Sequence, residues 1–357
     1  FDYQAETPSL AGLLRRLFVS ELYYQVRDES LLKSFAHHRL PSAGRQNAVV
    51  FLTQWRDSRG KEGSYDAAAE AIAEEQRVGE ILSTMELETL RGIYTFSGAE
   101  RLVLVALRDY LLNESHTVDV KRVQEIASER RKGHWLADPR PEQGERKALS
   151  KAYKAIVAAA QLFELSSSYH HRLEFATPDA LLVAYTKDLY RFDRLYREFC
   201  NAALPALRQG WDVLKKLNDE VAAVYDQRYL QPLGVEWSRL LDAGFLKEWS
   251  SAKLRPQQGF YEKHVKPLLA ESERRRAFVI ISDAFRYEAA TELTEKLNGR
   301  YRMDAELSAM LGVLPSYTAL GMASLLPHKT LAYNAKGEVL VDGKPVASTA
   351  TRSKRLE

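Results

Sequence analysis

Cysteine is almost missing from this chain, which has a single one, Cys200, among its 357 residues. One thiol excludes an internal disulfide framework and also a cysteine-rich zinc site. Because Cys200 stands among the apolar residues of an expected helix, we interpret it as a buried, inert thiol. An apolar run long enough to cross a membrane is missing too, so no membrane partner is expected. The composition favours a globular protein of the cytoplasm.

An excess of charge of one sign is also missing. The chain has 51 Lys and Arg against 48 Asp and Glu, so its formal net charge is only +3. An overall excess of positive charge, which would indicate nucleic-acid binding, is therefore missing. Local basic patches remain open, and DNA stays an alternative partner. The runs at residues 130–132 and 274–276 each follow an acid, Glu129 or Glu273, and such pairing favours solvated faces over phosphate contacts.

Apolar residues with helical spacing fill most of the chain before Ala277. One seam of a long amphipathic helix is formed by Leu182, Tyr185, Leu189, Phe192, Tyr196 and Phe199. Thr177 and Pro178 supply an N-cap and a first-turn proline for this helix. Residues 149–160 and 214–224 repeat the pattern, and we expect these helices to pack as an antiparallel bundle.

The earlier part of the chain predicts further helices. They are expected from Leu10 onward, over residues 67–90 and over residues 100–112. The polar, proline-bearing stretch at residues 137–144 is typical of a joint between two helical parts. The sequence therefore predicts a helical region over residues 1–136 and a helical bundle region over residues 146–270.

Residues 278–281 form an apolar run that ends in Ser282 and Asp283. Such a run is typical of a strand buried on both faces of a sheet. Ligands of open α/β sheets bind beyond the carboxyl ends of the strands, which would place Asp283 where a metal or phosphate is held. A carboxylate oxygen suits a divalent cation. Taken alone, an aspartate in this position is more often the N-cap of the next helix.

A second informative stretch follows at residues 303–328. Alternation over residues 303–309 predicts a half-buried strand, followed by turns at Gly312 and Pro315. Thr318 then precedes a short helical run that Pro327 ends. A hydroxyl at such a place is most often a cap, but near a metal it can become a nucleophile.

Residues 282–288 and 314–328 together resemble the PglZ family of bacterial BREX anti-phage systems. Its catalytic domain is similar to the alkaline phosphatase superfamily, in which an Asp and a Ser or Thr nucleophile share two metal ions, usually zinc. The resemblance implies that Asp283 is a metal ligand and that Thr318 is both the nucleophile and a metal ligand. Pro315 has the spacing of a Pro-x-x-Thr nucleophile turn. Ser316 and Ser324 remain alternative nucleophiles.

The resemblance also implies further Asp and His ligands after the nucleophile. After Thr318 the chain offers only His328 and Asp342. Asp342-Gly343 is typical of a hairpin turn, and His328 of a surface histidine. The chain begins at Phe1 and ends soon afterwards, so we interpret it as an internal fragment, inactive on its own and binding no metal, whereas the intact protein would hold two zinc ions.

These observations predict a mainly α N-terminal helical region followed, at residues 275–357, by the first part of an α/β domain of alkaline phosphatase type. The implied activity is metal-dependent hydrolysis of phosphoesters in a BREX defence system, with other BREX proteins as partners. The substrate-binding residues stay unknown; Arg286 is a candidate phosphate contact and equally a surface arginine. The alternative is a non-catalytic scaffold that docks partners of the defence complex.

Overall fold

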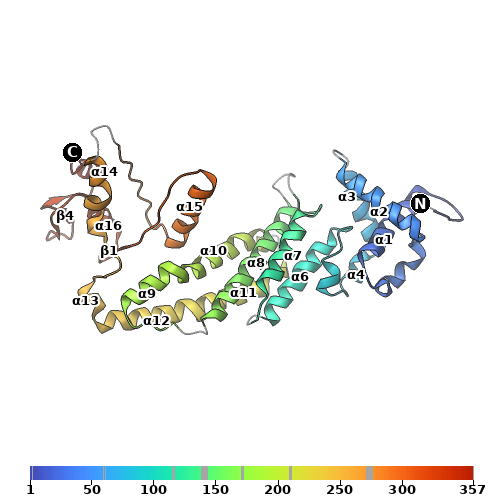
Figure 1. Ribbon diagram of the computed structural model, residues 1–357, viewed down its shortest axis with the longest axis horizontal. Coiled ribbons are helices and arrows are strands. Elements are labelled where there is room, and N and C mark those ends of the chain that lie inside the picture. Colours follow the sequence, from blue (N-terminus) through green and yellow to red (C-terminus); the bar gives the residue numbers. More distant parts are fainter. Residues whose placement is uncertain are drawn as a thin grey trace. The chain divides into compact units, whose positions relative to one another are not determined.

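The computed structural model describes residues 1, 3–58, 60, 62–114, 117–137, 144–169, 173–208, 211–270 and 276–356 (Figure 1). Most of the expected joint at residues 137–144 lies outside these ranges. The chain divides into two compact units. The first, called here the helical unit, comprises Phe1–His171 and Leu195–Tyr229, and the second, the C-terminal unit, comprises Arg172–Arg194 and Leu230–Glu357.

The helical unit consists of helices and the loops between them. Its α-helices are α1 (Leu10–Gln25), α2 (Ser42–Asp57), α3 (Glu62–Glu75), α4 (Val78–Leu82), α5 (Leu87–Leu90), α6 (Gly98–Asn113), α7 (Val120–Lys132), α8 (Glu145–Ser168), the end of α10 (Tyr190–Arg208) and α11 (Lys215–Tyr225). The long helix α8 contacts α6, α7 and α11. In Figure 1, α6, α7 and α8 are coloured cyan to green. The expected helices at residues 100–112 and 149–160 lie within α6 and α8.

The apolar seams predicted for this unit are largely buried. On α8, Leu149, Tyr153, Ile156 and Ala160 are all buried, and Val157 is half-buried. The seam on and before α11, formed by Leu214, Leu217, Val221 and Val224, is buried throughout. Burial of these side chains supplies most of the driving force that holds the helices together.

Two sequence predictions for this unit are wrong. The single helix expected over residues 67–90 is three helices: Arg77 adopts a left-handed conformation with φ of 49° between α3 and α4, and a turn that ends at the extended Glu86 separates α4 from α5. The basic run at residues 130–132 is not wholly solvated either. Arg130 is fully buried and forms an ion pair with Glu100, while Glu129 pairs with Arg91 instead.

Cys200 on α10 is half-buried, so the prediction of a buried thiol is only partly correct. Partial removal from water raises the pKa of its thiol, although a hydrogen bond with Tyr196 opposes this shift. A raised pKa leaves less thiolate at neutral pH, and the inert character expected from the sequence is consistent with that direction.

The C-terminal unit mixes helices with short strands. It contains α9 (Pro178–Ala184), the start of α10, α12 (Gln231–Leu240), α13 (Leu246–Glu248), α14 (Lys266–Ala270), α15 (Tyr287–Arg300), α16 (Thr318–Ser324) and α17 (Thr349–Ser353). Helix α9 begins as predicted, with the Thr177 hydroxyl accepting a hydrogen bond from the Ala180 N–H and Pro178 in the first turn.

Five short strands occur among the described residues of this unit. β1 (Arg255–Pro256) pairs in parallel with β2 (Met310–Leu311). β3 (Leu331–Tyr333), β4 (Val339–Val341) and β5 (Lys344–Pro345) form an antiparallel sheet in that order. Asp342 and Gly343 join β4 to β5 with φ angles of 47° and 76°, so the hairpin turn predicted there is present.

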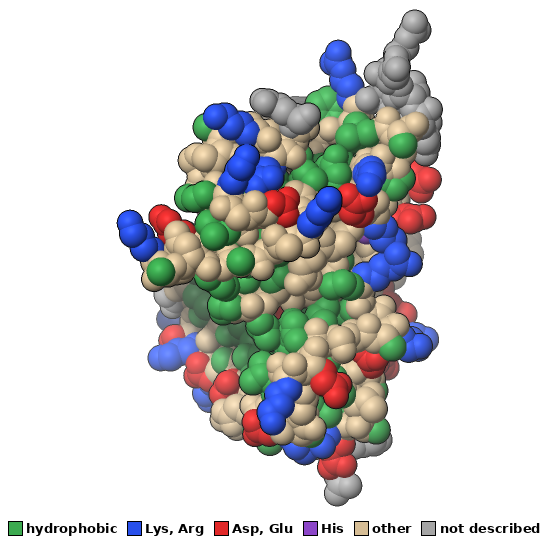
Figure 2. All heavy atoms as spheres, turned by 90° about the vertical axis from the view of Figure 1, so that its left-hand side faces the viewer, with side chains coloured by type: hydrophobic (Ala, Val, Ile, Leu, Met, Phe, Trp, Pro, Cys, Tyr) green, Lys and Arg blue, Asp and Glu red, His purple; other side chains and the backbone are tan. Residues whose placement is uncertain are grey.

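The strand predicted at residues 278–281 does not form. The segment is extended and pairs with no other strand among the described residues, and Phe278 and Ile280 are 85% and 92% exposed. The prediction of burial on both faces is wrong for this chain because no neighbouring strand covers the apolar run. Figure 2 shows hydrophobic side chains open on one face, among Lys, Arg, Asp and Glu side chains.

The side chains of residues 303–309 alternate between half-buried and exposed as predicted, but this segment forms no strand hydrogen bonds among the described residues. Ala305, Leu307 and Ala309 are half-buried while their neighbours are exposed, and the pattern continues to Leu311 and Val313. Strand hydrogen bonds begin only at Met310. The period of two is present in the burial, but the prediction of a strand over residues 303–309 is wrong: β2 begins directly after this range, at Met310, opposite the two-residue strand β1.

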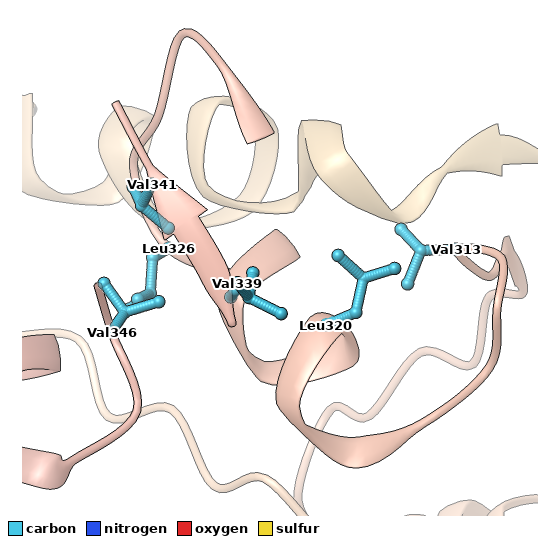
Figure 3. Packing of buried hydrophobic residues seen from close by; sticks show 7 residues of the cluster. Val313, Leu320, Leu326, Val339, Val341 and Val346 are labelled. Atoms are coloured by element: carbon cyan, nitrogen blue, oxygen red, sulfur yellow. The ribbon is translucent and has the colours of Figure 1, made fainter. Parts of the chain in front are cut away.

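A small core holds the end of the chain together (Figure 3). It consists of Val313, Leu320, Ala323, Leu326, Val339, Val341 and Val346, which come from the loop before α16, from α16 and the turn after it, from β4 and from the loop after β5. In Figure 3, Leu320 and Val339 point toward one another between α16 and β4. This cluster fixes α16 on the sheet.

In the described part of the chain, no helix combines the length and the apolar character needed to cross a membrane.

Candidate functional site

Asp283 and Thr318, which are 35 residues apart in sequence, lie side by side in the C-terminal unit. The Thr318 hydroxyl donates a hydrogen bond to Asp283 Oδ2, with 3.1 Å between the oxygens. Both residues are exposed. The structure thus brings together the two residues that the sequence singled out, in a place that solvent can reach.

Neither residue acts as a helix cap. The N-cap of α15 is Arg286, and that of α16 is Tyr317, which makes no side-chain capping bond. Asp283 lies in a turn, where its Oδ1 accepts a hydrogen bond from the Ala284 N–H at 3.0 Å. The capping interpretation that the sequence left open is therefore wrong for both side chains.

The main chain on both sides of the pair is constrained. Ala284 has a φ of 55°, a left-handed conformation that is uncommon for residues with a side chain. It turns the chain sharply after Asp283. Thr318 is the first residue of α16, whose Leu320 and Ala323 are buried in the cluster of Figure 3.

Gln257 connects the loop before Thr318 to helix α16. Its Oε1 accepts a hydrogen bond from the Val313 N–H at 3.3 Å, and its Nε2 donates to the Gly321 carbonyl at 3.2 Å. Trp249 Nε1 donates to the Gly312 carbonyl at 2.7 Å in the same loop. Sequence reasoning missed Gln257, because a single glutamine about sixty residues before Thr318 carries no local signal.

The two alternative nucleophiles differ in setting. Ser324 is fully buried, and its hydroxyl donates to the Gly321 carbonyl at 2.8 Å, so no substrate reaches it. Ser316 is exposed. Of the three hydroxyls, that of Thr318 has the hydrogen bond to the carboxylate.

His328 and Asp342 serve local structure. His328 is half-buried rather than on the surface, and its Nδ1 lies 2.6 Å from the Leu326 carbonyl. Asp342 Oδ1 accepts hydrogen bonds from the N–H groups of Lys329 and Thr330, both at 2.9 Å. These bonds lower the pKa of the Asp342 carboxyl.

The donor atoms at the Asp283–Thr318 pair fit part of a metal site. A carboxylate oxygen and a hydroxyl oxygen within 3.1 Å of one another suit two adjacent positions around a divalent cation. No group of three or more His, Cys, Asp or Glu side chains able to hold a metal ion occurs among the described residues. The pair is therefore a partial donor set.

Arg286, Tyr287 and Glu288, which follow Asp283, differ in exposure and contacts. Arg286 is exposed next to the turn. Tyr287 donates a hydrogen bond to the Thr186 carbonyl at 3.2 Å and packs against Tyr190. Glu288 is buried. Arg286 is thus the one of these three that remains free to face a ligand near Asp283.

A comparison with known families matches the C-terminal part of the chain. Residues 260–357, which include Asp283 and Thr318, match the family described as "BREX system PglZ alkaline phosphatase-like domain". Residues 260–357 are a PglZ domain. The resemblance found in the sequence is confirmed.

Two curated relatives extend the similarity beyond the PglZ domain. Alkaline phosphatase-like protein BrxZ of Escherichia coli O9:H4 (strain HS) is 34% identical over 358 residues, which cover 99% of this chain and 41% of the relative. Alkaline phosphatase-like protein PglZ of Bacillus cereus (strain H3081.97) is 33% identical over 312 residues, 87% of this chain and 35% of the relative. The chain thus spans well under half of these relatives. No solved structure matches it.

Proposed function

We propose that the PglZ domain takes part in metal-dependent hydrolysis of a phosphoester in a BREX defence system, with Thr318 as nucleophile and Asp283 as metal ligand. The observation that supports this most directly is the 3.1 Å hydrogen bond between the Thr318 hydroxyl and Asp283 Oδ2. It joins a nucleophile to a hard anionic donor at an exposed place, which is the arrangement that such chemistry needs.

The chemistry of the pair follows from its geometry. Asp283 Oδ2 accepts the hydrogen bond of the Thr318 hydroxyl and so orients Oγ1. Divalent ions, two zinc ions in our proposal, would lower the pKa of that hydroxyl and stabilise charge on the phosphoryl oxygens. Thr318 Oγ1 attacks phosphorus, the P–O bond to the leaving alcohol breaks, and the alcohol takes up a proton. Water then cleaves the phosphothreonine and restores the hydroxyl.

The wider assignment is also a proposal. We propose that the hydrolase-type domain begins near residue 275, that residues 1–136 and 146–270 form separate helical parts, and that other BREX proteins are partners. The metal ligands beyond Asp283 and Thr318 would come from residues other than those described. Whether the substrate is a monoester, a nucleic-acid diester or a modified protein stays open.

A scaffold function is the second candidate. Its support is the partial donor set, since no cluster of three metal-ligating side chains occurs in the described ranges, together with the large share of helix. In that case, the helical parts dock other components of the defence complex, and the PglZ domain serves recognition.

Hydrolysis of an activated phosphodiester by the protein at its natural length separates the two functions. We expect turnover that requires zinc, stops with chelator and disappears in Thr318→Ala, while Thr318→Ser keeps part of it. Ser316→Ala removes the exposed hydroxyl of the alternative nucleophile two residues away, and we expect it to keep the activity. Equal activity of the Thr318→Ala and unchanged proteins, with unchanged melting curves, would rule out the nucleophile and favour the scaffold.

A further inference from the structure

A pocket of about 500 Å³ lies between α7, α8 and α10 within the helical unit. Its volume is in the range of small-molecule sites, roughly 300–1,000 Å³. The lining from α7 includes Gln124, Ala127, Ser128 and Arg131, that from α8 includes Lys151, Lys154, Val157, Ala158 and Gln161, and that from α10 consists of Glu198, Asn201 and Ala202. The pocket belongs to a different unit from the Asp283–Thr318 pair.

Three cations line this pocket. Arg131 stands on α7, and Lys151 and Lys154 stand one turn apart on α8. Among the described residues, neither lysine ammonium has a carboxylate partner, and Arg131 makes only a 3.5 Å contact with the Ser150 hydroxyl. Other arginines of the unit are paired, for example Arg122 with Glu88. The pocket therefore gathers three cations, none of which forms an ion pair with a carboxylate among the described residues.

The electrostatics of Lys154 agree with that geometry. Partial removal from water lowers the pKa of its ammonium, and the charges of Arg131 and Lys151 lower it further. Like charges held close together destabilise the free protein, and an anion bound between them relieves the repulsion. Glu198, which also lines the pocket, is not among the charges that shift the pKa of Lys154.

The remaining lining is apolar or carries amides. Ala127, Ala158 and Ala202 are buried, and Val157 is half-buried, so they form an apolar floor. Gln124 and Gln161 also line the pocket, and their amides can donate or accept hydrogen bonds. An apolar floor with a few convergent polar groups suits a ligand that has one apolar part and one charged part.

We propose that this pocket binds a small organic phosphate, with the phosphate between Arg131, Lys151 and Lys154 and an apolar or planar body on the alanine floor. A single small molecule fits better than a nucleic-acid strand, because the cations converge on one pocket and the net charge of the chain is only +3. The proposal does not rest on the hydrolase activity.

Calorimetric titration with adenosine 5′-monophosphate (AMP) tests the site, with adenosine and inorganic phosphate as partial probes. The titration uses Thr318→Ala protein with chelator, so that the proposed hydrolase site neither turns over nor retains the probe through metal. We expect one AMP per chain, and binding at least about tenfold weaker for each partial probe, because each lacks either the charged or the apolar contacts.

Variants locate the binding. Lys154→Gln and Lys151→Gln are each expected to weaken AMP binding about tenfold, the effect of losing one charge-assisted hydrogen bond. Lys121→Gln is the matched control, since it removes an exposed lysine of α7 that does not line the pocket. Asn201→Trp fills the pocket without removing charge and is expected to abolish binding, with an unchanged melting curve for each variant.

Three results would overturn the proposal. The first is no saturable AMP binding at millimolar concentration. The second is AMP binding that Lys154→Gln and Asn201→Trp leave unchanged. The third is lysine-dependent binding of single-stranded DNA by a protein that does not bind AMP, which would assign the cations to a nucleic-acid surface instead.

Discussion

Arg130 and Glu100 form an ion pair in the interior of the helical unit, with 2.5 Å between Nη2 and Oε1 and no exposure of either side chain. Arg130 Nε also donates to Glu100 Oε2 at 3.1 Å, so the pair is bidentate. The Tyr153 hydroxyl donates to the same carboxylate at 2.8 Å, and the Ile93 carbonyl accepts from Arg130 Nη1 at 2.8 Å. This network connects α6, α7, α8 and the turn before α6.

Glu100→Gln is expected to lower the free energy of unfolding by about 3–5 kcal/mol, because it leaves a buried guanidinium without its counter-charge. Urea denaturation followed by circular dichroism measures the change. Glu129→Gln is the matched control, since it removes the half-exposed partner of Arg91 and should cost less than about 1 kcal/mol. Equal losses for the two variants would contradict the prediction.

Asp283→Asn is expected to raise the zinc concentration needed for half-maximal phosphodiesterase activity of the natural-length protein by more than about 100-fold. Loss of an outer-sphere partner alone typically costs 10–100-fold, and Asp283 is proposed to contact the metal directly. Zinc titration of activity gives the shift. Asp304→Asn is the control, because Asp304 is an exposed carboxylate of the same unit. An unchanged zinc requirement in Asp283→Asn would remove Asp283 from the metal site.

Gln257→Ala is expected to loosen the loop that carries Thr318. The change removes the acceptor for the Val313 N–H and the donor to the Gly321 carbonyl, about 1 kcal/mol for each hydrogen bond. Hydrogen exchange at the Val313 amide should become faster, and turnover should fall more than substrate affinity. The exposed neighbour Gln258 offers the control Gln258→Ala. Val313 exchange at the same rate in both variants would show that Gln257 does not hold the loop.

Glu236 makes the C-terminal unit sensitive to acid. Hydrogen bonds from Arg239 and from the Phe175 N–H lower the pKa of Glu236 from 4.5 to about 2. A carboxyl with a depressed folded-state pKa stabilises the fold fully above its unfolded value, and this contribution disappears as the pH falls toward 2. We therefore expect stability to fall between about pH 5 and pH 2.

The matched variants for this pH effect are Glu236→Gln and Glu262→Gln. Glu236→Gln should be less stable at neutral pH and should show a flatter stability profile between pH 5 and pH 2. Glu262 pairs with Lys266 on an exposed surface, so its substitution should leave the profile nearly unchanged. Thermal melting across this pH interval distinguishes them, and parallel profiles for Glu236→Gln and the unchanged protein would refute the assignment.

Asp283 and Thr318 could be singled out from the sequence because each stands in a short motif, at residues 282–288 and 314–328. The helical seams were predictable as well, since the spacing of residues such as Leu217 and Val221 depends only on local periodicity. The sequence did not reveal the burial of Arg130, because its counter-charge, Glu100, lies thirty residues earlier. It also did not reveal Gln257, whose role depends on contacts between distant segments.

A local sequence pattern cannot by itself predict whether a strand forms. Residues 278–281 have the composition of a buried strand, yet a strand exists only where a partner supplies hydrogen bonds and cover. The hairpin at Asp342 was predictable, because both of its strands are adjacent in sequence and the turn residues specify the connection.

The extended segment at residues 278–281 exposes apolar side chains that another strand could cover. Phe278 and Ile280 share one side of it, and each is more exposed than Val279 or Ile281 on the other side. An extended segment with exposed apolar side chains and no strand partner among the described residues is a template for strand addition. We expect the isolated chain to self-associate as its concentration rises, until another strand occupies the edge beside Asp283.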